Sequence, residues 1–509
     1  MSKRINRNIY RSLLILSFLG INGLILFGLS TTLSYLNSGA DRSSMLHLEA
    51  NLDESYLPKM NWDRAKNLGR PIGDQTLMEI EKDYLSAWHV RNMAYKSNDP
   101  FGIHDYYTDS ARVKLFDIIN LNKANDIELN TTTLAHNPKI EFYSTDGTLV
   151  VISDNNVTSY EEIYKADKLL VKQRDTTNYQ IMMLLEDGFW RIRHLEINSK
   201  ELETVQLETQ DSINRVEDIN SIKGVNYYPK DSPWDMFGKK FNDSIIDADY
   251  KLIKSMGLNT IRIFIQYEDF GKANVLKEKL DKLKVALDLA QENNINVIVT
   301  LFDFYGNYDV SDWTITDRHA EQIVTIFKDH KAIIAWDIKN EPDLDFDSRG
   351  KEMILAWLEN MILNIKNWDK NHPVTIGWSS PQAAINLSKE VDFVSFHYYQ
   401  DLNAFEYAMD NLKLEIPNKP IVLQEYGISS YSGIWNLYKG SEKKQAAYYE
   451  QIQKVIKEKN IPYVFWTLFD FEEVPVDVAG RLPWRTKKQH YFGCIDKKGN
   501  KKAYFKHLK

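Results

Sequence analysis

Two glutamates, each following a short apolar run, could together break a glycosidic bond. Glu341 follows the run 332–340, and Glu425 follows the run 419–424. Runs of this length bounded by Pro or Gly are typical of buried strands, and a carboxylate at the strand exit has no role in packing. In a barrel of parallel strands, both carboxylates would meet at one mouth. Such a pair predicts the chemistry of a retaining glycosidase.

The residues around the two glutamates must supply that barrel. From residue 222 to the carboxyl terminus, β-rich runs alternate with amphipathic helical stretches such as 278–293, 320–329, 353–368 and 443–457. The candidate strands are 222–228, 259–265, 295–303, 332–338, 373–378, 391–398, 419–425 and 461–467. This alternation predicts an α/β fold, a (β/α)8 barrel, over residues 220–509. A doubly wound sheet would also alternate, but no Gly-rich phosphate turn follows any of the strands.

Barrel enzymes carry their active residues at the carboxyl ends of the strands. Here those positions hold Asn226, Tyr227, Arg262, Asp303, Asn340, Glu341, Trp378, His397, Tyr399, Glu425 and Trp466. The set is polar and aromatic although each member ends an apolar run. A purely structural barrel would have no use for it.

These segments resemble clan A glycoside hydrolases, most closely family 5 and the barrel domain of family 2, over residues 221–505. The tripeptide Asn340-Glu341-Pro342 after the fourth strand and Glu425 after the seventh carry the resemblance. One position departs from it, because many family 5 members have a histidine at the end of the third strand, where this chain has Asp303. The departure leaves the particular family and the substrate open.

The resemblance implies a role for each residue. Glu425 would be the nucleophile and Glu341 the acid/base, with a pKa raised by apolar surroundings and by Glu425. Arg262 and Tyr399 would hold Glu425 ionised and oriented. A slip of one residue at the strand end would put Tyr398 in place of Tyr399.

Substrate contacts follow from the same resemblance. Asn340 would donate to the sugar 2-hydroxyl, and Trp466 would form a flat floor under the reacting sugar. His397 is either a supporting residue or a satisfied core histidine. The remaining candidates for substrate binding are Asn226, Tyr227 and Trp378. Five tryptophans are candidates for sugar stacking or for core packing: Trp234, Trp313, Trp378, Trp435 and Trp484.

The amino terminus predicts a membrane anchor. No charged residue occurs from Ser12 to Ala40, and this stretch is long enough to cross a hydrocarbon core of about 30 Å. Residues 1–11 form a basic tail, so the positive-inside rule predicts a cytoplasmic amino terminus, a single-pass helix over 12–36 and a periplasmic or extracellular catalytic domain. The alternative is a signal peptide cleaved near Ala40, although its apolar region would be shorter.

Between anchor and barrel, the sequence predicts a second, smaller domain. Residues 37–73 are polar and read as a spacer, and residues 199–219 read as a solvated linker. A leading helix followed by alternating runs over 74–198 is typical of an α+β module. Its order of elements resembles the nuclear-transport-factor-2-like cone fold. Such a domain could hold a small ligand, mediate a dimer or protein contact, or serve as a rigid spacer; we favour spacer or interaction module.

Composition narrows the function classes. The formal net charge is −8, and no basic stripe with interleaved aromatics appears, so a nucleic-acid partner is not expected. Cys494 is the only cysteine, which excludes an intrachain disulfide and a thiolate metal cluster. No spacing of His, Asp and Glu suggests a required metal, and no cofactor is expected.

The sequence therefore predicts a membrane-anchored retaining β-glycoside hydrolase or transglycosylase that acts on a β-linked polysaccharide. The rival hypothesis is a non-catalytic glycan-binding or scaffold protein of an exopolysaccharide or cell-surface assembly. The two glutamates count against it, because a binding protein needs no nucleophile.

Overall fold

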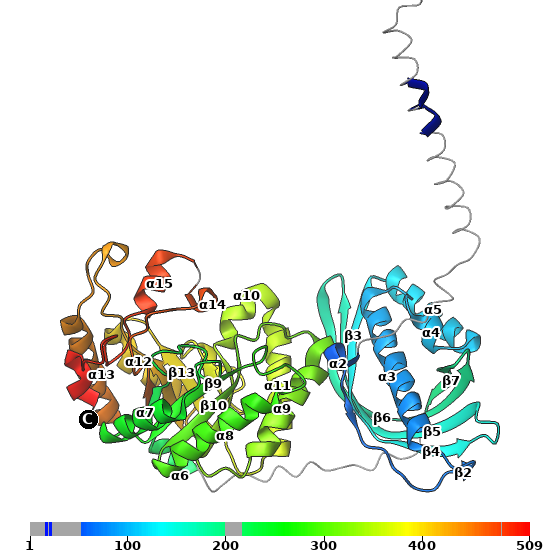
Figure 1. The fold of residues 1–509 in the computed structure, drawn as a ribbon, viewed down its shortest axis with the longest axis horizontal. Helices are drawn as coiled ribbons and strands as arrows, with labels where there is room; N and C mark the ends of the chain where they lie inside the picture. Colours follow the sequence, from blue (N-terminus) through cyan, green and yellow to red (C-terminus); the bar gives the residue numbers. More distant parts are fainter. Residues whose placement is uncertain (1–15, 19, 23–51, 199–215, 480, 509) are drawn as a thin grey trace, which may run out of the picture.

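The computed structural model describes residues 16–18, 20–22, 52–198, 216–479 and 481–508. Two domains lie side by side in it, an α+β domain in blue to cyan and a barrel in green to red (Figure 1). The predicted basic tail 1–11, most of the predicted anchor 12–36 and most of the linker 199–219 lie outside the described residues. Within the described part, no helix is both long and apolar enough to span a membrane.

Eight parallel strands close the barrel in the order β10-β11-β12-β13-β14-β15-β8-β9. Their bounds are β8 Lys223–Asn226, β9 Thr260–Gln266, β10 Asn296–Asp303, β11 Ile333–Asn340, β12 Val374–Trp378, β13 Val394–Tyr398, β14 Ile421–Tyr426 and β15 Tyr463–Phe465. All eight predicted strands are confirmed, with ends shifted by a few residues. Helices follow the strands around the outside, so the predicted (β/α)8 barrel is confirmed as well.

The helices of the barrel domain bury one face against the strands. Their bounds are α6 Val216–Asn220, α7 Asp243–Ser255, α8 Lys277–Glu292, α9 Trp313–Phe327, α10 Phe346–Arg349, α11 Lys351–Trp368, α12 Phe405–Glu415, α13 Glu442–Lys459, α14 Val476–Ala479 and α15 Pro483–Gln489. Short 3-10 turns also occur: η2 Val310–Asp312, η3 Pro342–Asp345, η4 Ala383–Ile385, η5 Leu402–Ala404, η6 Ile434–Asn436 and η7 Ala503–Leu508. Because the strands are buried on both faces, they read as near-continuous apolar runs.

The α+β domain packs helices against a seven-stranded sheet. Its helices are α2 Leu52–Ser55, α3 Asp74–Ser97, α4 Ile103–Tyr106 and α5 Asp109–Ala124. Its strands are β1 Lys59–Met60, β2 Leu68–Gly69, β3 Ile127–His136, β4 Pro138–Tyr143, β5 Leu149–Lys165, β6 Lys168–Glu186 and β7 Phe189–Ile197. The long strands β5 and β6 pair antiparallel, and their alternating burial leaves one face to the helices.

The range 37–73 was predicted to be a spacer, and its described part does not fit that prediction. β1 pairs parallel with β3, and β2 pairs parallel with β4. Residues 59–69 therefore contribute two short edge strands to the sheet. Tyr56 is fully buried in the domain. Paired strands of two residues carry no periodic apolar pattern, which is why the sequence did not indicate them.

The two domains share a packed interface. The ring of Tyr160 on β5 stacks on Trp313 at the start of α9, with centroids 4.2 Å apart. Lys96 at the end of α3 forms an ion pair with Asp309, just before η2, at 2.5 Å. Arg174 on β6 donates to Asn360 on α11 at 2.8 Å. The α+β domain therefore holds the segment that follows β10, and that segment begins at the mouth of the barrel.

Candidate active site

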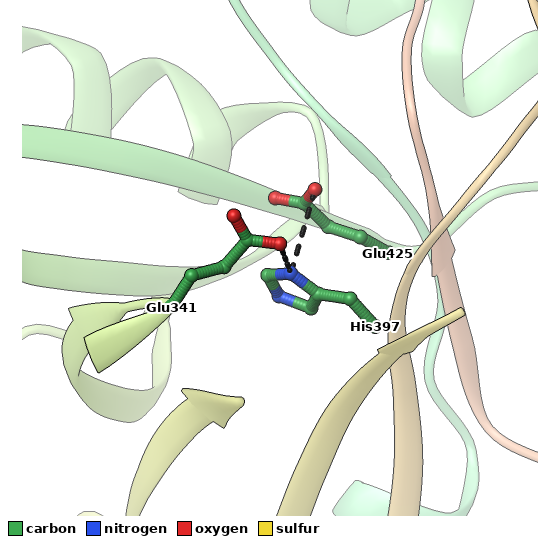
Figure 2. A group of neighbouring side chains, drawn as sticks. All are labelled: Glu341, His397 and Glu425. Atoms are coloured by element: carbon green, nitrogen blue, oxygen red, sulfur yellow. Dashed lines mark hydrogen bonds and ion pairs between the residues drawn. The ribbon is translucent and has the colours of Figure 1, made fainter. Parts of the chain in front are cut away.

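The two glutamates meet at the carboxyl-terminal mouth of the barrel. Glu341 directly follows β11, and Glu425 lies near the end of β14. One oxygen of each carboxylate and one ring nitrogen of His397 all lie within 4.8 Å of one another. Figure 2 shows both carboxylates directed toward the same ring nitrogen of His397. The barrel therefore brings together two carboxylates and a histidine that lie far apart in the sequence.

Glu341 occupies a strained backbone position. Its φ is 48° and its ψ is 50°, in the left-handed region that residues other than glycine seldom adopt. Its amide donates to the carbonyl of Gly377 on β12 at 2.7 Å, which fixes the turn out of the strand. Such strain persists only where the surrounding structure enforces it, and it is common at functional sites. Here it directs the Glu341 side chain across the mouth toward Glu425.

Glu425 is held by two donors. Arg262 Nη1 donates to Oε1 at 2.7 Å, and the Tyr399 hydroxyl donates to Oε2 at 2.9 Å. Both contacts favour the ionised carboxylate and fix its orientation. The alternative tyrosine, Tyr398, donates instead to the carbonyl of Asp401 at 2.6 Å, so the structure selects Tyr399.

Arg262 is the centre of a buried polar network. It is 0% exposed and reaches Asp337 Oδ2 through Nη2 at 2.6 Å. The same Nη2 donates to Asn340 Oδ1 at 2.9 Å, and Nη1 donates to Asn226 Oδ1 at 3.2 Å. A Cβ at Gly377 would lie 2.8 Å from Nη2, so the absence of a side chain there makes room for the guanidinium. The network makes the Arg262 guanidinium a fixed support for the Glu425 carboxylate.

His397 is fully buried and contacts both glutamates. Its Nδ1 lies 2.8 Å from Glu341 Oε1 and 3.6 Å from Glu425 Oε2. Burial acts to raise the pKa of Glu341, but the hydrogen bond and charge of His397 outweigh it and lower that pKa below the ordinary value. Burial raises the pKa of Glu425, against the opposing charges of His397 and Arg262. The predicted raised pKa of Glu341 is therefore not found in the free protein, because His397 donates to it.

A cleft of about 600 Å³ opens above these groups. Its walls are formed by Tyr228, Trp234, Phe264, Asp303, Phe304, Tyr305, Gly306, Lys339, Asn340, Glu341, Leu344, Asp345, Tyr399, Glu425, Trp466, Val478, Gln489 and Phe492. Trp466 lies beside Trp234, with ring centroids 5.9 Å apart, and Tyr228 stacks on Phe264 at 5.1 Å. Flat aromatic surface next to a carboxylate pair suits a sugar ring.

Three predicted substrate-binding residues lie away from this cleft. Asn226 is fully buried behind Arg262, and its amide donates to the carbonyl of Gln424 at 3.0 Å. The Tyr227 hydroxyl donates outward to Asp249 on α7 at 2.8 Å, and Trp378 is buried near Phe346. Successive residues leaving a strand face opposite sides, so at the end of β8 the next residue, Tyr228, lines the cleft instead. Asn340 and Trp466 line it as predicted.

The candidate tryptophans divide in the same way. Trp234 lines the cleft, and Trp313 packs at the domain interface. Trp435 on η6 and Trp484 on α15 are about half exposed and lie together, with centroids 6.2 Å apart. Sequence spacing could not distinguish these environments, because each of these four tryptophans lies on a segment after a strand or on a helical turn.

Lys339 and Asp345 line the cleft without having been predicted, and Asp303 was noted at a strand end without a role. Lys339 immediately precedes Asn340 on β11, and Asp303 ends β10. Both are nearly buried, at 4% and 3% exposure. Asp303 carried a signal, because it ends a strand where the resemblance expects a histidine. Lys339 carried a weaker signal: it is a lysine near the end of a mainly apolar run.

Glu341, His397 and Glu425 also have the spacing of a candidate metal-ligand group. Their contacts fit proton transfer better. Glu425 already accepts from the Arg262 guanidinium and the Tyr399 hydroxyl, and Glu341 already receives a hydrogen bond from His397. Carboxylates held by protein cations and donors in this way are arranged for acid/base and nucleophilic work.

Comparison with known proteins agrees with this geometry. Residues 221–472 match the model of the family described as Cellulase (glycosyl hydrolase family 5). The β-glucuronidase of Chlorocebus aethiops is 26% identical over 275 residues, which are 50% of this chain and 40% of that protein. Mannan endo-1,4-beta-mannosidase 3 of Arabidopsis thaliana is 28% identical over 218 residues, 34% of this chain and 50% of that protein.

Among solved structures, an exo-beta-1,4-mannosidase from Opitutaceae bacterium strain TAV5 is 16% identical, with a TM-score of 0.46. The similarity covers 56% of this chain and 57% of that chain. The chain thus spans half the length or less of the curated relatives described above.

Proposed function

We propose that this chain, whose barrel is a glycoside hydrolase domain of family 5, cleaves or transfers a β-glycosidic bond with retention of configuration. The observation that carries this proposal is that one oxygen of Glu341 and one oxygen of Glu425 lie within 4.8 Å of each other. Retaining enzymes place their two carboxyl groups about 5–5.5 Å apart, and inverting enzymes about 6.5–9.5 Å apart. The substrate class is a β-linked polysaccharide, in keeping with an open cleft.

In the first step, the Glu425 carboxylate attacks the anomeric carbon and the bond to the leaving oxygen breaks. Glu341 gives its proton to that oxygen, so the aglycone leaves as a neutral alcohol. In the second step, Glu341 takes a proton from water, the water oxygen attacks the anomeric carbon, and the ester bond to Glu425 breaks. A sugar hydroxyl in place of water would give transglycosylation.

Supporting residues fit these steps. Asn340 Oδ1 accepts a hydrogen bond from Arg262 Nη2. Its Nδ2 has no hydrogen-bond partner among the described residues, so an N–H remains to donate to the sugar 2-hydroxyl. Trp466 would lie beneath the ring. The Glu341 side chain is 24% exposed in the free protein. A bound sugar would cover it, and that burial would raise its pKa toward the value that a general acid needs.

The test uses the purified full-length chain on a panel of β-glycans and activated aryl β-glycosides. Glu425→Gln should abolish turnover, and Glu341→Ala should lower it by about 10²–10⁴-fold on poor leaving groups. Azide should restore turnover of Glu341→Ala on an activated substrate and give a β-glycosyl azide. Full activity in Glu425→Gln would refute the mechanism. Binding of a glycan without turnover of any substrate would favour the rival scaffold hypothesis.

We also propose that residues 12–36 anchor the chain with its catalytic domain outside the cytoplasm. The uncharged stretch after four basic residues supports this. The α+β domain would act as a spacer or interaction module of the nuclear-transport-factor-2-like kind that holds the barrel at its interface. Resistance of the membrane-bound chain to alkaline extraction tests the anchor; release into the soluble fraction would argue for cleavage.

A further inference from the structure

One wall of the cleft carries a lysine whose charge has no direct partner. Lys339 Nζ makes one hydrogen bond, to the carbonyl of Asn340 at 3.3 Å. No carboxylate oxygen lies within 4.0 Å of it among the residues that the structure describes. An ammonium group has three donors, so most of its hydrogen-bonding capacity faces the cleft. A charged group that is 4% exposed normally has partners, which indicates that a ligand supplies them here.

Asp303 faces the same cleft with spare acceptor capacity. Its Oδ2 accepts from the Tyr228 hydroxyl at 3.3 Å. Burial raises the pKa of Asp303 to about 7, while the charges of Lys339 and Arg262 oppose that rise. Lys339 and Asp303 thus influence each other electrostatically without forming a contact ion pair. A group placed between them could accept from one and donate to the other.

The charge balance of the cleft decides what that group is. Four carboxyl groups line it, those of Asp303, Glu341, Asp345 and Glu425, against the single ammonium of Lys339. The Arg262 guanidinium is committed to Asp337 and Glu425. A uronic acid would bring a fifth carboxylate into this nearly buried acidic site, where like charges are costly. A sugar hydroxyl has no such cost, because it accepts from an ammonium and donates to a carboxylate.

We propose that Lys339 and Asp303 together bind hydroxyl groups of an uncharged pyranose, so that the cleft selects neutral β-hexosides and rejects β-hexuronosides. This inference rests on the proposed glycoside hydrolase function. It separates two kinds of relative, because a glucuronide carries a carboxylate and a mannoside does not. Lys339 and Asp303 act here as specificity-determining residues.

The test is a set of 2,4-dinitrophenyl β-glycosides that share one leaving group: the glucoside, the mannoside and the glucuronide. The full-length wild-type chain should have a kcat/KM for one neutral glycoside at least about tenfold above that for the glucuronide. Lys339→Met should lower kcat/KM on the preferred neutral glycoside by about tenfold to a hundredfold, the range of a hydrogen bond to a charged group. Asp303→Asn should shift the ratio of rates toward the glucuronide, because it removes one carboxylate.

The matched control is Lys251→Met on the exposed face of α7, which should leave all three rates unchanged. The thermal transition of each variant shows whether it folds, and the ratio of rates is independent of the amount of folded protein. Preference of the wild type for the glucuronide would overturn the inference and leave the proposed function intact. Turnover of none of the three glycosides, nor of any β-glycan, would refute the proposed function and the inference with it.

Discussion

A fully buried histidine contacts a carboxylate in each of the two domains, but only one of these pairs faces a cleft. In the barrel, His397 Nδ1 contacts Glu341 at 2.8 Å, at the base of the cleft. In the α+β domain, His136 Nδ1 contacts Asp154 at 2.7 Å. Both histidines are 0% exposed. Burial and an acidic partner therefore do not distinguish a reactive site from a structural one.

The difference lies in how completely each cluster satisfies its own polar atoms. Asp154 also accepts from the Tyr84 hydroxyl and the Asn137 amide, both at 2.7 Å, and His136 Nε2 lies 2.9 Å from the Thr133 hydroxyl. In the barrel, His397 Nε2 has no hydrogen-bond partner among the described residues. Asn340, Lys339 and Asp303 line the cleft and keep unused hydrogen-bonding capacity there. Hydrogen-bond donors and acceptors that line a cleft without protein partners therefore distinguish the candidate active site from the structural cluster.

The largest expected effect comes from removing the cation of the barrel cluster. Arg262→Met leaves Asp337 and Glu425 without their ion-pair partner in a buried site. Breaking a buried pair in this way costs about 3–5 kcal/mol of the free energy of unfolding. Turnover should be lost as well, because Glu425 loses its stronger donor. Chemical denaturation and the kcat on an activated aryl glycoside measure the two effects.

The control for Arg262→Met separates stability from catalysis. Adding Asp337→Asn removes one of the two stranded charges, so the double variant should regain part of the lost stability without regaining turnover. Recovery of activity in the double variant would contradict the role of Arg262 as the support of the nucleophile.

A smaller effect of the opposite kind is expected in the α+β domain. Asp154→Asn puts an amide where three donors converge, and should lower the free energy of unfolding by about 1–3 kcal/mol. The kcat/KM should not change, because this cluster has no opening to substrate. Asp167→Asn, in the exposed turn between β5 and β6, is the matched control and should change neither quantity. Loss of activity in folded Asp154→Asn would show that the cluster around His136 contributes to function, and would contradict the contrast drawn between the two histidine clusters.

The barrel and most of its site could be predicted because strand ends obey a simple geometric rule. Alternation of β-rich runs with amphipathic helical stretches indicated all eight strands, and parallel strands bring Glu341, Tyr399 and Glu425 to one mouth. Arg262 lies inside β9 and reaches Glu425 through its long side chain. The prediction is one residue off at the end of β8, where Tyr228 rather than Tyr227 lines the cleft.

Other features depend on contacts that no local pattern encodes. The left-handed turn at Glu341 is enforced by β12, and the lowered pKa of Glu341 depends on the position of a histidine from β13. The cluster around His136 joins β3, β5 and α3, whose residues are far apart in sequence. Its members look like ordinary polar residues on alternating strands, so sequence periodicity did not single them out.

The finest distinction between the two histidines is the pH dependence of turnover. His397 lowers the pKa of Glu341 and opposes the rise of the pKa of Glu425 that burial causes. In His397→Asn both pKa values should therefore rise. The pH profile of kcat/KM depends on the ionisation of both glutamates in the free enzyme, so both of its limbs should move to higher pH.

The matched control for that shift is His136→Asn, which should leave both limbs at their wild-type positions while lowering stability. A second readout separates the two glutamates. With a dinitrophenyl leaving group that needs no proton, only the acidic limb should move in His397→Asn, because Glu341 no longer acts as an acid in the first step. Unmoved limbs, or limbs displaced to lower pH, would mean that His397 is a packing residue like His136. The contrast between the domains would then rest on the cleft alone.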